Sequence, residues 1–398
     1  MSPARATSPA TPSTPGPEPL GALCLVLHGH LPYVLHHGAW PHGEAWLFEA
    51  AAETYLPLLD TIGEVALHKI RPALTIGLTP VLLEQLAHDR FKQGFVAYLA
   101  ERADRARADR RLFESQNQPD FAALAERWAE WYEARLAHFE RIHRDIPAAF
   151  AARRREGHVQ LLTSTATHAY TPLLLHDASI RAQFACGTQT TEDRLGFRAT
   201  GMWLPECAYR PSWDHWVPSV LFDDARSRPG LEQFMAEAGV THFFVDTRLV
   251  TEAKPLGTMD GPGGAFRTVI EPQLYWDRKR GWNDPLRPVG VSSATEPPRA
   301  FAFARHPKVS EQVWSGFVGY PASGEYLDFH RKHPASHLRY HRVTDPRSDE
   351  KQPYDPEATP ARLYEQGQHF CDLARDLLRE FKQQTGQPGV CDAPFDAE

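Results

Sequence analysis

The sequence predicts an α/β protein built on a parallel (β/α) barrel, and two observations support this. Short apolar runs recur along the 398 residues and alternate with stretches of helical periodicity, as in barrels and doubly wound sheets. Candidate functional residues follow the ends of several of these runs, which is where a parallel barrel places its chemistry. A doubly wound sheet would concentrate them at one switch point instead. We therefore expect the barrel.

Seven strands are predicted, and most are apolar on both faces, as parallel strands covered by helices are. They are Ala22–His28, Ala73–Leu78, Val159–Thr163, Thr200–Leu204, His242–Val245, Ala300–Ala304 and Gly389–Phe395. Polar side chains fall at the C-terminal ends of four of them, at His28, Thr163, Glu206 and Asp246. We expect these four residues to share one rim of the barrel.

Two long helices are predicted by apolar residues that recur at spacings of three and four, over residues 121–142 and 363–381. Pro360 is a suitable first-turn residue for the second helix. Residues 89–156 are too many for one crossover helix, so we expect a helical insertion there. Residues 251–298 are rich in Gly and Pro and should form a long loop, a candidate lid that carries Tyr275.

The first 19 residues are rich in Pro, Ser and Thr and are predicted to be disordered, which leaves residues 20–398 for the barrel domain. A net charge of −7 argues against nucleic acid or an anionic membrane as the main partner. No run approaches the roughly 20 apolar residues of a membrane span. Five widely spaced cysteines without a C-x-x-C pair indicate reduced thiols and a cytoplasmic protein.

A carboxylate directly follows an apolar strand in the sequence GMWLPECAYRP, which begins at Gly201. Pro205 ends the strand because it cannot extend the hydrogen-bonded ladder, and Glu206 comes next with Trp203 nearby. Glycoside chemistry needs a carboxylate held rigidly beneath an anomeric carbon, with aromatic surface to hold the sugar ring. The alternative is a glutamate that caps the strand end or pairs with Arg210.

Two histidines follow the first strand in the sequence His28-Gly29-His30. Residues two apart on a strand face the same side, so both imidazoles can converge on one ligand. They could bind a metal such as zinc, with Asp246, Glu206 or His168 as further ligands, or they could hydrogen-bond sugar hydroxyls. They could also be two partly buried polar residues of a loop.

Two further segments carry weaker signals. The strand that starts at Val159 leads through Thr163 to His168, which alone is typical of a satisfied loop histidine. The last strand ends in a carboxylate at Asp396, two residues before the end of the chain, and a terminal acidic tail is usually just solvated.

Taken together, these segments resemble glycoside hydrolase family 57 and, within it, the 1,4-α-glucan branching enzymes. The resemblance spans nearly the whole chain from about Leu20. His28–Tyr33, Gly157–Leu161, Trp203–Tyr209 and Phe395–Glu398 look like the family's four motifs in order, and the stretch between Gln312 and His330 is similar to the branching-enzyme group.

The resemblance implies a TIM-like α/β fold, an incomplete (β/α)7 barrel with helical insertions. Glu206 falls at the position of the nucleophile and Asp396 at that of the general acid/base. The residues that look like sugar-binding ones are His28, His30, Trp46, His168, Trp203 and Trp314. No cofactor and no metal is implied.

The activity implied is a retaining transfer in glycogen biosynthesis, in which an α-1,4-glucan is cleaved and joined through a new α-1,6 branch. The two carboxyl groups should then lie roughly 5–5.5 Å apart. Two departures from the family stand out. Gln160 takes the place of a usual Glu, and the chain ends at Glu398 where family members continue into a C-terminal helical domain, which we expect to be absent.

Three alternatives remain open. An α-amylase or a 4-α-glucanotransferase of the same family would use the same nucleophile with a different acceptor. A truncated, inactive form would bind glucan without turning it over. A metal-dependent carbohydrate hydrolase or deacetylase would use His28 and His30 as ligands. The oligomeric state is not predicted by the sequence.

Overall fold

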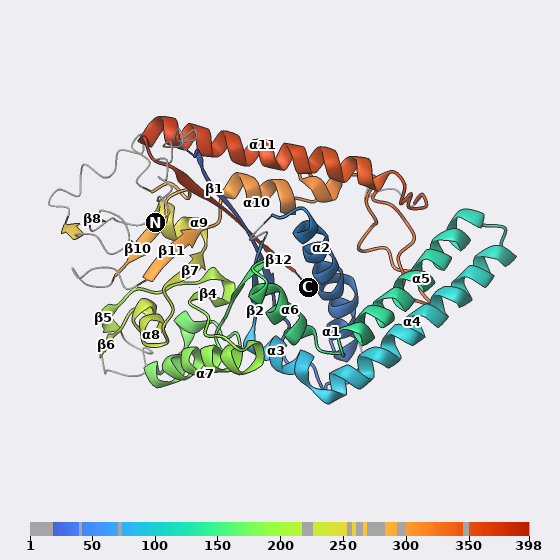
Figure 1. Ribbon diagram of the computed structural model, residues 1–398, viewed down its shortest axis with the longest axis horizontal. Coiled ribbons are helices and arrows are strands. Elements are labelled where there is room, and N and C mark those ends of the chain that lie inside the picture. The colour runs from blue at the N-terminus through green and yellow to red at the C-terminus, as the bar shows by residue number, and fades with distance from the viewer. Residues whose placement is uncertain are drawn as a thin grey trace, which may run out of the picture.

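Seven parallel strands form the centre of the protein in a computed structural model of the chain, arranged around a common axis (Figure 1). The structure describes residues 19–39, 42–70, 74–216, 226–252, 257–259, 266–268, 283–292, 300–344 and 350–397. The strands of the barrel are β1 (Gly21–Gly29), β2 (Leu74–Leu78), β3 (Val159–Leu162), β4 (Gly201–Trp203), β7 (His242–Val245), β11 (Ala300–Ala304) and β12 (Gly389–Asp396). The seven predicted strands are therefore confirmed, with no end shifted by more than one residue.

The seven strands belong to two sheets, ordered β12-β1-β2-β3 and β10-β11-β7-β4. The two sheets meet at both pairs of edges through single bridges, Thr163 with Met202 and Arg305 with Asp392, both parallel. A continuous ladder is thus interrupted at two seams. The predicted incomplete (β/α)7 barrel is confirmed, and it is not closed by a full set of ladder hydrogen bonds.

Three smaller strand pairs flank the barrel. β10 (Val289–Val291) lies at the edge of its sheet, antiparallel to β11. β5 (Trp213–Trp216) pairs with β6 (Arg226–Arg228), and β8 (Gly257–Met259) pairs with β9 (Phe266–Thr268). All three pairings are antiparallel, so these strands add to the periphery and not to the barrel wall.

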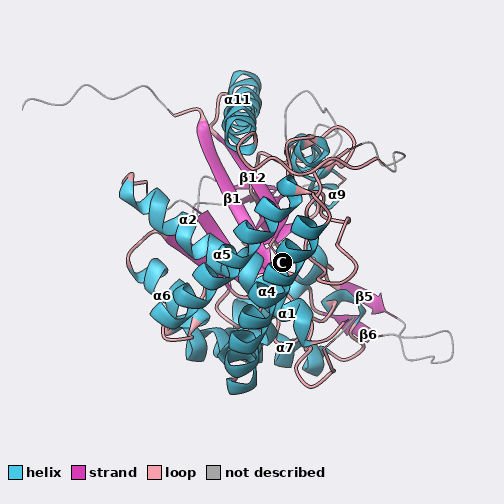
Figure 2. Ribbon diagram, turned by 90° about the vertical axis from the view of Figure 1, so that its right-hand side faces the viewer, coloured by secondary structure: helices cyan, strands magenta, loops and turns pink. Residues whose placement is uncertain are grey.

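Helices cover the outside of the strands. The first group consists of α1 (Glu44–Ala50), a π-helical turn (Ala51–Tyr55), α2 (Leu56–Leu67), α3 (Pro80–Ala87), α4 (Asp89–Ser115), α5 (Pro119–Arg141) and α6 (Ile146–Arg155). The second consists of α7 (Asp177–Leu195), α8 (Leu231–Glu237), α9 (Thr247–Thr251), α10 (Pro307–Trp314) and α11 (Thr359–Thr385). Short 3₁₀ turns lie at Thr171–Leu173, Pro205–Cys207 and Tyr320–Ala322. Figure 2 shows β1 and β12 side by side, with α11 packed over them.

The two helices predicted from periodicity are confirmed as α5 and α11, and Pro360 lies in the first turn of α11. Helices α4 and α5 form an antiparallel hairpin that extends away from the barrel (Figure 1). The apolar faces of this hairpin, of α1 to α3 and of α6 form one large core, which is separate from the residues inside the barrel.

Several predictions lie wholly or largely outside the described residues. These are the disordered N-terminal segment, most of the 251–298 loop including Tyr275, and Glu398. No helix in the described part of the chain is both long and apolar enough to cross a membrane.

Candidate active site

The chain makes a left-handed turn directly after β4. Glu206 and Cys207 both have positive φ, at 56° and 51°, inside a 3₁₀ turn that starts at Pro205. Two consecutive non-glycine residues in this region are uncommon, and such backbone occurs mostly where the surrounding structure enforces it, often at functional sites. The turn sends the two side chains in different directions, because Cys207 is buried inside the barrel and Glu206 is exposed.

The Glu206 carboxylate has no cationic side chain against it among the described residues. The predicted alternative partner, Arg210, is buried and donates to the carbonyl oxygens of Pro211 and Pro229, each at 2.9 Å. The interpretation of Glu206 as half of an ion pair with Arg210 is therefore wrong. An exposed carboxylate on a constrained turn is available to a ligand.

Three imidazoles gather beside this turn, as the strand periodicity predicted for two of them. The rings of His28 and His30 have centroids 6.2 Å apart and planes at 18°, and His168 lies 4.9 Å from the first and 4.0 Å from the second. His168 comes from the loop after β3 and has a positive φ of 55°. The structure thus brings together residues 140 positions apart in the sequence.

Trp203 supports this imidazole cluster from inside the barrel. Its indole lies flat under the His28 ring, with centroids 4.4 Å apart and planes at 9°. Trp203 is 3% exposed and packs with Val26, Leu162 and Phe244. Its ring is therefore covered by His28, and in this structure it supports a candidate binding residue without itself being open to a ligand.

A hydrogen-bond chain fixes the tautomers of two of the imidazoles. The Ser164 hydroxyl donates to the backbone oxygen of Trp203 at 2.8 Å, so it accepts from Nδ1 of His168 at 2.9 Å. His168 Nε2 is then unprotonated and accepts from His28 Nε2 at 3.3 Å. Nδ1 of His28 is consequently the bare nitrogen of that ring, assigned from the network and not observed directly.

The imidazoles are held neutral by their surroundings. Burial lowers the pKa of His30 to about 4 and that of His168 to about 3. Burial, with the neighbouring imidazoles, lowers the pKa of His28 well below its usual value. At neutral pH the cluster therefore offers uncharged donors and acceptors, which suit neutral hydroxyl groups better than anions.

Asp396 ends β12 beside β1, where it is in register with His28. The backbone N–H of Ala397 donates to the backbone oxygen of His28 at 2.8 Å, so the ladder continues past Asp396. Burial raises the pKa of Asp396, and the positive charge of Arg305 acts in the opposite direction. Asp396 is thus a carboxyl group with a raised proton affinity beside the imidazoles.

The pKa of the buried Cys207 thiol is affected by the charged groups of the site. Burial raises its pKa to about 12, while the charge of Arg305 acts against this shift and those of Asp246, Asp396 and Glu206 add to it. Both candidate carboxylates therefore lie close enough to influence the same buried thiol. They come from β4 and β12, which are not neighbours in either sheet.

The two remaining candidate aromatic residues are half-exposed. Trp314, at the end of α10, is 48% exposed and makes an edge contact with the ring of Phe395, next to Asp396, at 6.3 Å. Trp46, on α1, is 38% exposed and makes an edge contact with His42 at 6.1 Å. Trp314 therefore lies beside the residue that precedes Asp396, and Trp46 is connected to the imidazoles only through the body of its helix.

Two of the four residues predicted to share the rim have structural partners. The Thr163 hydroxyl is buried and bonds that of Thr191 on α7 at 2.6 Å, so it faces away from the site. Asp246 accepts from the backbone N–H of Arg248 at 3.0 Å and caps the N-terminus of α9. The expectation that all four side chains share the rim is wrong for Thr163, because its hydroxyl points outward to α7.

Three contributors to the site were missed in the sequence. Arg305 follows β11 at the same rim, and the position of its strand was the signal that could have found it. Thr79 follows β2, and its hydroxyl contacts Nδ1 of His30 at 3.1 Å. Ser164 holds His168, a role that depends on a left-handed loop without any recognisable pattern. Within the described residues, no group of three or more His, Cys, Asp or Glu side chains is arranged to hold a metal ion.

The geometry combines an exposed carboxylate on a rigid turn, a second carboxyl group with raised pKa and a neutral hydrogen-bonding cluster. One carboxyl group can attack carbon while the other supplies and removes a proton, with the imidazoles holding a polyhydroxylated molecule in place. The half-exposed indole rings of Trp46 and Trp314 offer surfaces on which the apolar face of a sugar can stack.

The chain is similar to known proteins over most of its length. The family model of glycosyl hydrolase family 57 matches residues 24–332. The chain is 35% identical over 380 residues to a 1,4-α-glucan branching enzyme from Thermococcus kodakarensis, a match that covers 95% of this chain and 52% of that protein.

Two solved structures are similar to this one. The GH57-type branching enzyme from Pyrococcus horikoshii has a TM-score of 0.81 at 33% identity, covering 95% of this chain and 64% of that one. The α-amylase AmyC from Thermotoga maritima has a TM-score of 0.75 at 27% identity, covering 95% of this chain and 67% of that one. The chain thus spans about half of the Thermococcus relative and about two thirds of these two structures.

Proposed function

Because the chain belongs to glycosyl hydrolase family 57, we propose that it carries the catalytic centre of a retaining enzyme that acts on α-1,4-glucans. The observation that carries the proposal is the exposed Glu206 on its left-handed turn. Asp396 is joined to this turn through His28, which is in register with Asp396 and stacks on Trp203. The neutral imidazoles of His28, His30 and His168 are the proposed hydroxyl-binding groups. Partners of this chemistry are amylose-like or glycogen-like chains.

In the proposed reaction, the Glu206 carboxylate attacks the anomeric carbon of a glucose unit. The bond from that carbon to the 4-oxygen of the next unit breaks, and Asp396 gives its proton to the leaving oxygen. In the second half, the Asp396 carboxylate takes the proton of an acceptor hydroxyl, whose oxygen displaces Glu206 from the anomeric carbon. Two inversions retain the α configuration, and the geometry needs the carboxyl groups roughly 5–5.5 Å apart.

We propose the 6-hydroxyl of a second glucan as the acceptor, which makes the product an α-1,6 branch. The support is that the Thermococcus and Pyrococcus relatives are both branching enzymes. Such a reaction would belong to glycogen biosynthesis, and the five cysteines, all of them free, fit a reducing cytoplasmic setting. A second candidate is an α-amylase with water as acceptor, which the likeness to AmyC supports.

Incubation with amylose tests the proposal. Proton NMR should show new α-1,6 signals at constant total glucose, whereas shorter linear chains alone would indicate hydrolysis or disproportionation. Glu206→Gln should reduce turnover at least about a thousandfold because it removes the nucleophile. The matched control is Glu237→Gln, an exposed carboxylate on α8 paired with Arg181, which should leave turnover unchanged.

Two outcomes would overturn the proposal. Wild-type protein that binds amylose but yields no product would indicate a glucan-binding form without turnover. Stoichiometric zinc in protein purified without chelators, with activity lost on its removal, would indicate metal-dependent hydrolysis through His28 and His30.

A further inference from the structure

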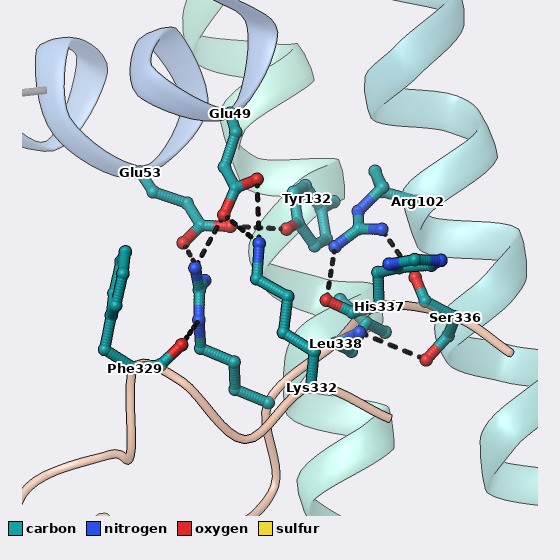
Figure 3. Close-up of polar contacts among 10 residues, drawn as sticks. Glu49, Glu53, Arg102, Tyr132, Phe329, Lys332, Ser336, His337 and Leu338 are labelled. Carbon is teal, nitrogen blue, oxygen red and sulfur yellow. Dashed lines mark hydrogen bonds and ion pairs between the residues drawn. The ribbon is translucent and has the colours of Figure 1, made fainter. Parts of the chain in front are cut away.

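Two cations converge on α1 and the π-helical turn from a segment far along the chain. Residues 328–342, the return segment, come back across α1, α4 and α5, and a single antiparallel bridge pairs Lys332 with Arg339 inside it. Figure 3 shows the Lys332 side chain directed at the carboxylate of Glu49. Arg339 forms ion pairs with both Glu49 and Glu53. These four residues form the clamp discussed below.

The contacts in the clamp are close and charge-balanced. Arg339 reaches Glu49 at 2.6 Å and Glu53 at 2.7 Å, and Lys332 reaches both oxygens of Glu49 at 3.0 and 3.2 Å. Arg339 is 4% exposed and its guanidinium lies over the ring of Phe329 at 4.7 Å. Burial opposes ionisation of Glu49, but the hydrogen bond from Lys332 and the two cationic charges lower its pKa overall.

The return segment is also fixed to the helical hairpin by hydrogen bonds from α4 and α5. These bonds keep Lys332 and Arg339 in place relative to the hairpin. Arg102 of α4 donates to the backbone oxygens of Ser336 and His337, at 2.6 and 3.3 Å. The indole N–H of Trp128 on α5 donates to the backbone oxygen of Arg339 at 2.7 Å. The cations are therefore held at a defined place relative to the helical hairpin.

In the clamp Arg339 is buried and the other three side chains are partly exposed, and an ion cluster of this kind contributes geometry more than stability. Apolar residues of similar volume often stabilise a fold as well or better, because the charges must be removed from water. Four charges within one contact network, however, are satisfied in only one relative placement of the segments that carry them. The clamp therefore fixes the placement of α1 relative to the return segment.

The clamped helix carries one candidate binding residue and supports two others. Trp46, Glu49 and Glu53 follow one another at spacings of three and four, so the clamp holds the same helix face as the indole. At the far end of the π-helical turn, the ring of Tyr55 packs against Gly29, where an added Cβ would lie 3.2 Å from it. Gly29 stands between His28 and His30. Helical turns of this π type are frequent at functional sites.

We propose that Arg339, assisted by Lys332, is a positioning residue for the glucan-binding site. It fixes α1 and the π-helical turn through Glu49 and Glu53, and thereby sets where Trp46 and the His28-Gly29-His30 segment meet the glucan. This inference rests on the proposed function, because it assigns Trp46 and the imidazoles to glucan binding. It adds a residue that touches no substrate and acts through the two glutamates on the helix face that also carries Trp46.

The test is a double-mutant cycle on amylose kinetics. Arg339→Met should raise KM about tenfold with kcat within about twofold, because ground-state and transition-state binding are lost together. Trp46→Ala should raise KM comparably, and adding Arg339→Met to it should cost little more, since the clamp acts partly through that indole. Arg339→Lys should recover most of the wild-type KM. The matched control is Arg135→Met, which breaks the half-buried pair of Arg135 with Asp60 between α5 and α2.

Hydrogen exchange provides a readout that does not need glucan. In Arg339→Met, but not in Arg135→Met, the amides of residues 44–55 and 29–31 should exchange at least about tenfold faster. If Arg339→Met does not fold, Glu53→Gln weakens the clamp more mildly and should show the same pattern.

Unchanged exchange in these segments, or KM effects of Arg339→Met and Trp46→Ala that simply multiply, would overturn the inference. A wild-type chain without action on amylose would instead refute the proposed function, and the exchange data would still decide whether the clamp fixes the helix.

Discussion

The imidazole of His28 lies flat on the indole of Trp203, with ring centroids 4.4 Å apart and planes at 9°. This stack links β1 to β4, which belong to different sheets of the barrel. The backbone oxygen of the same tryptophan holds Ser164, and Ser164 holds His168. One buried tryptophan therefore organises two candidate binding residues, one through its indole ring and the other through its backbone carbonyl group.

Replacing Ser164 with alanine should disorder that arrangement without unfolding the barrel. The variant loses the hydroxyl that keeps the proton on Nδ1 of His168, so the ring can flip and the bond to His28 is no longer enforced. We expect kcat/KM on amylose to fall about five- to tenfold, the equivalent of one hydrogen bond of about 1 kcal/mol. Ser179→Ala on the exposed face of α7 is the control. Unchanged kcat/KM in a folded Ser164→Ala protein would show that the tautomer of His168 is irrelevant.

Replacing Arg305 with methionine should shift the pH profile of the reaction. Burial raises the pKa of Asp396 and the charge of Arg305 counteracts this, so removing the charge raises that pKa further. Asp396 acts first as an acid and must be protonated, so the basic limb of kcat/KM should move to higher pH in Arg305→Met. A basic limb that stays in place or moves to lower pH would contradict the role of Asp396 as the acid.

Much of this site follows from the positions of strand ends, which the sequence reveals well. Buried parallel strands are continuous apolar runs, so their ends at His28, Glu206 and Asp396 are visible, and the fold places those ends on one rim. The barrel was predicted from these strand ends, and its incompleteness came from the resemblance. The pairing of β12 with β1 was not predicted, because no local pattern says which strands are neighbours.

The direction of each side chain at the rim was harder to predict. At Glu206 and Cys207 the backbone is left-handed, and this alone decides that the thiol and not the carboxylate faces the barrel core. Trp203 is the kind of residue on which a sugar ring often stacks, but its indole is covered by the His28 ring from another strand. Such outcomes depend on contacts between segments far apart in the chain, which periodicity within one segment does not contain.

Acid should destabilise the protein through the imidazole cluster. Burial holds the pKa of His168 at about 3, below the value of about 6.5 in the unfolded chain, so the unfolded state binds more protons between these values. Stability must therefore decrease as pH falls through that window. Urea unfolding at pH 7, 5.5 and 4.5 should show a smaller pH slope in His168→Gln than in wild type, by at most about 1 kcal/mol per pH unit. Equal slopes in the two proteins would contradict the lowered pKa.

Asp392 should have the opposite effect at alkaline pH. Its side chain is 1% exposed inside the barrel wall, at the position on β12 that pairs with Cys24 on β1. Burial raises the pKa of this carboxyl group from its usual 3.8 to about 8, against a weaker opposite effect of the hydrogen bond with Cys24. The folded state then binds a proton that the unfolded state releases between about pH 4 and pH 8, so stability is lost as pH rises through this window.

Asp392→Asn has nearly the shape of the protonated acid and does not titrate. Its thermal midpoint should be close to that of wild type near pH 5 and higher than that of wild type at pH 9. A wild-type thermal midpoint at pH 9 equal to or above that of Asp392→Asn would mean that the carboxylate is ionised and paired in the fold.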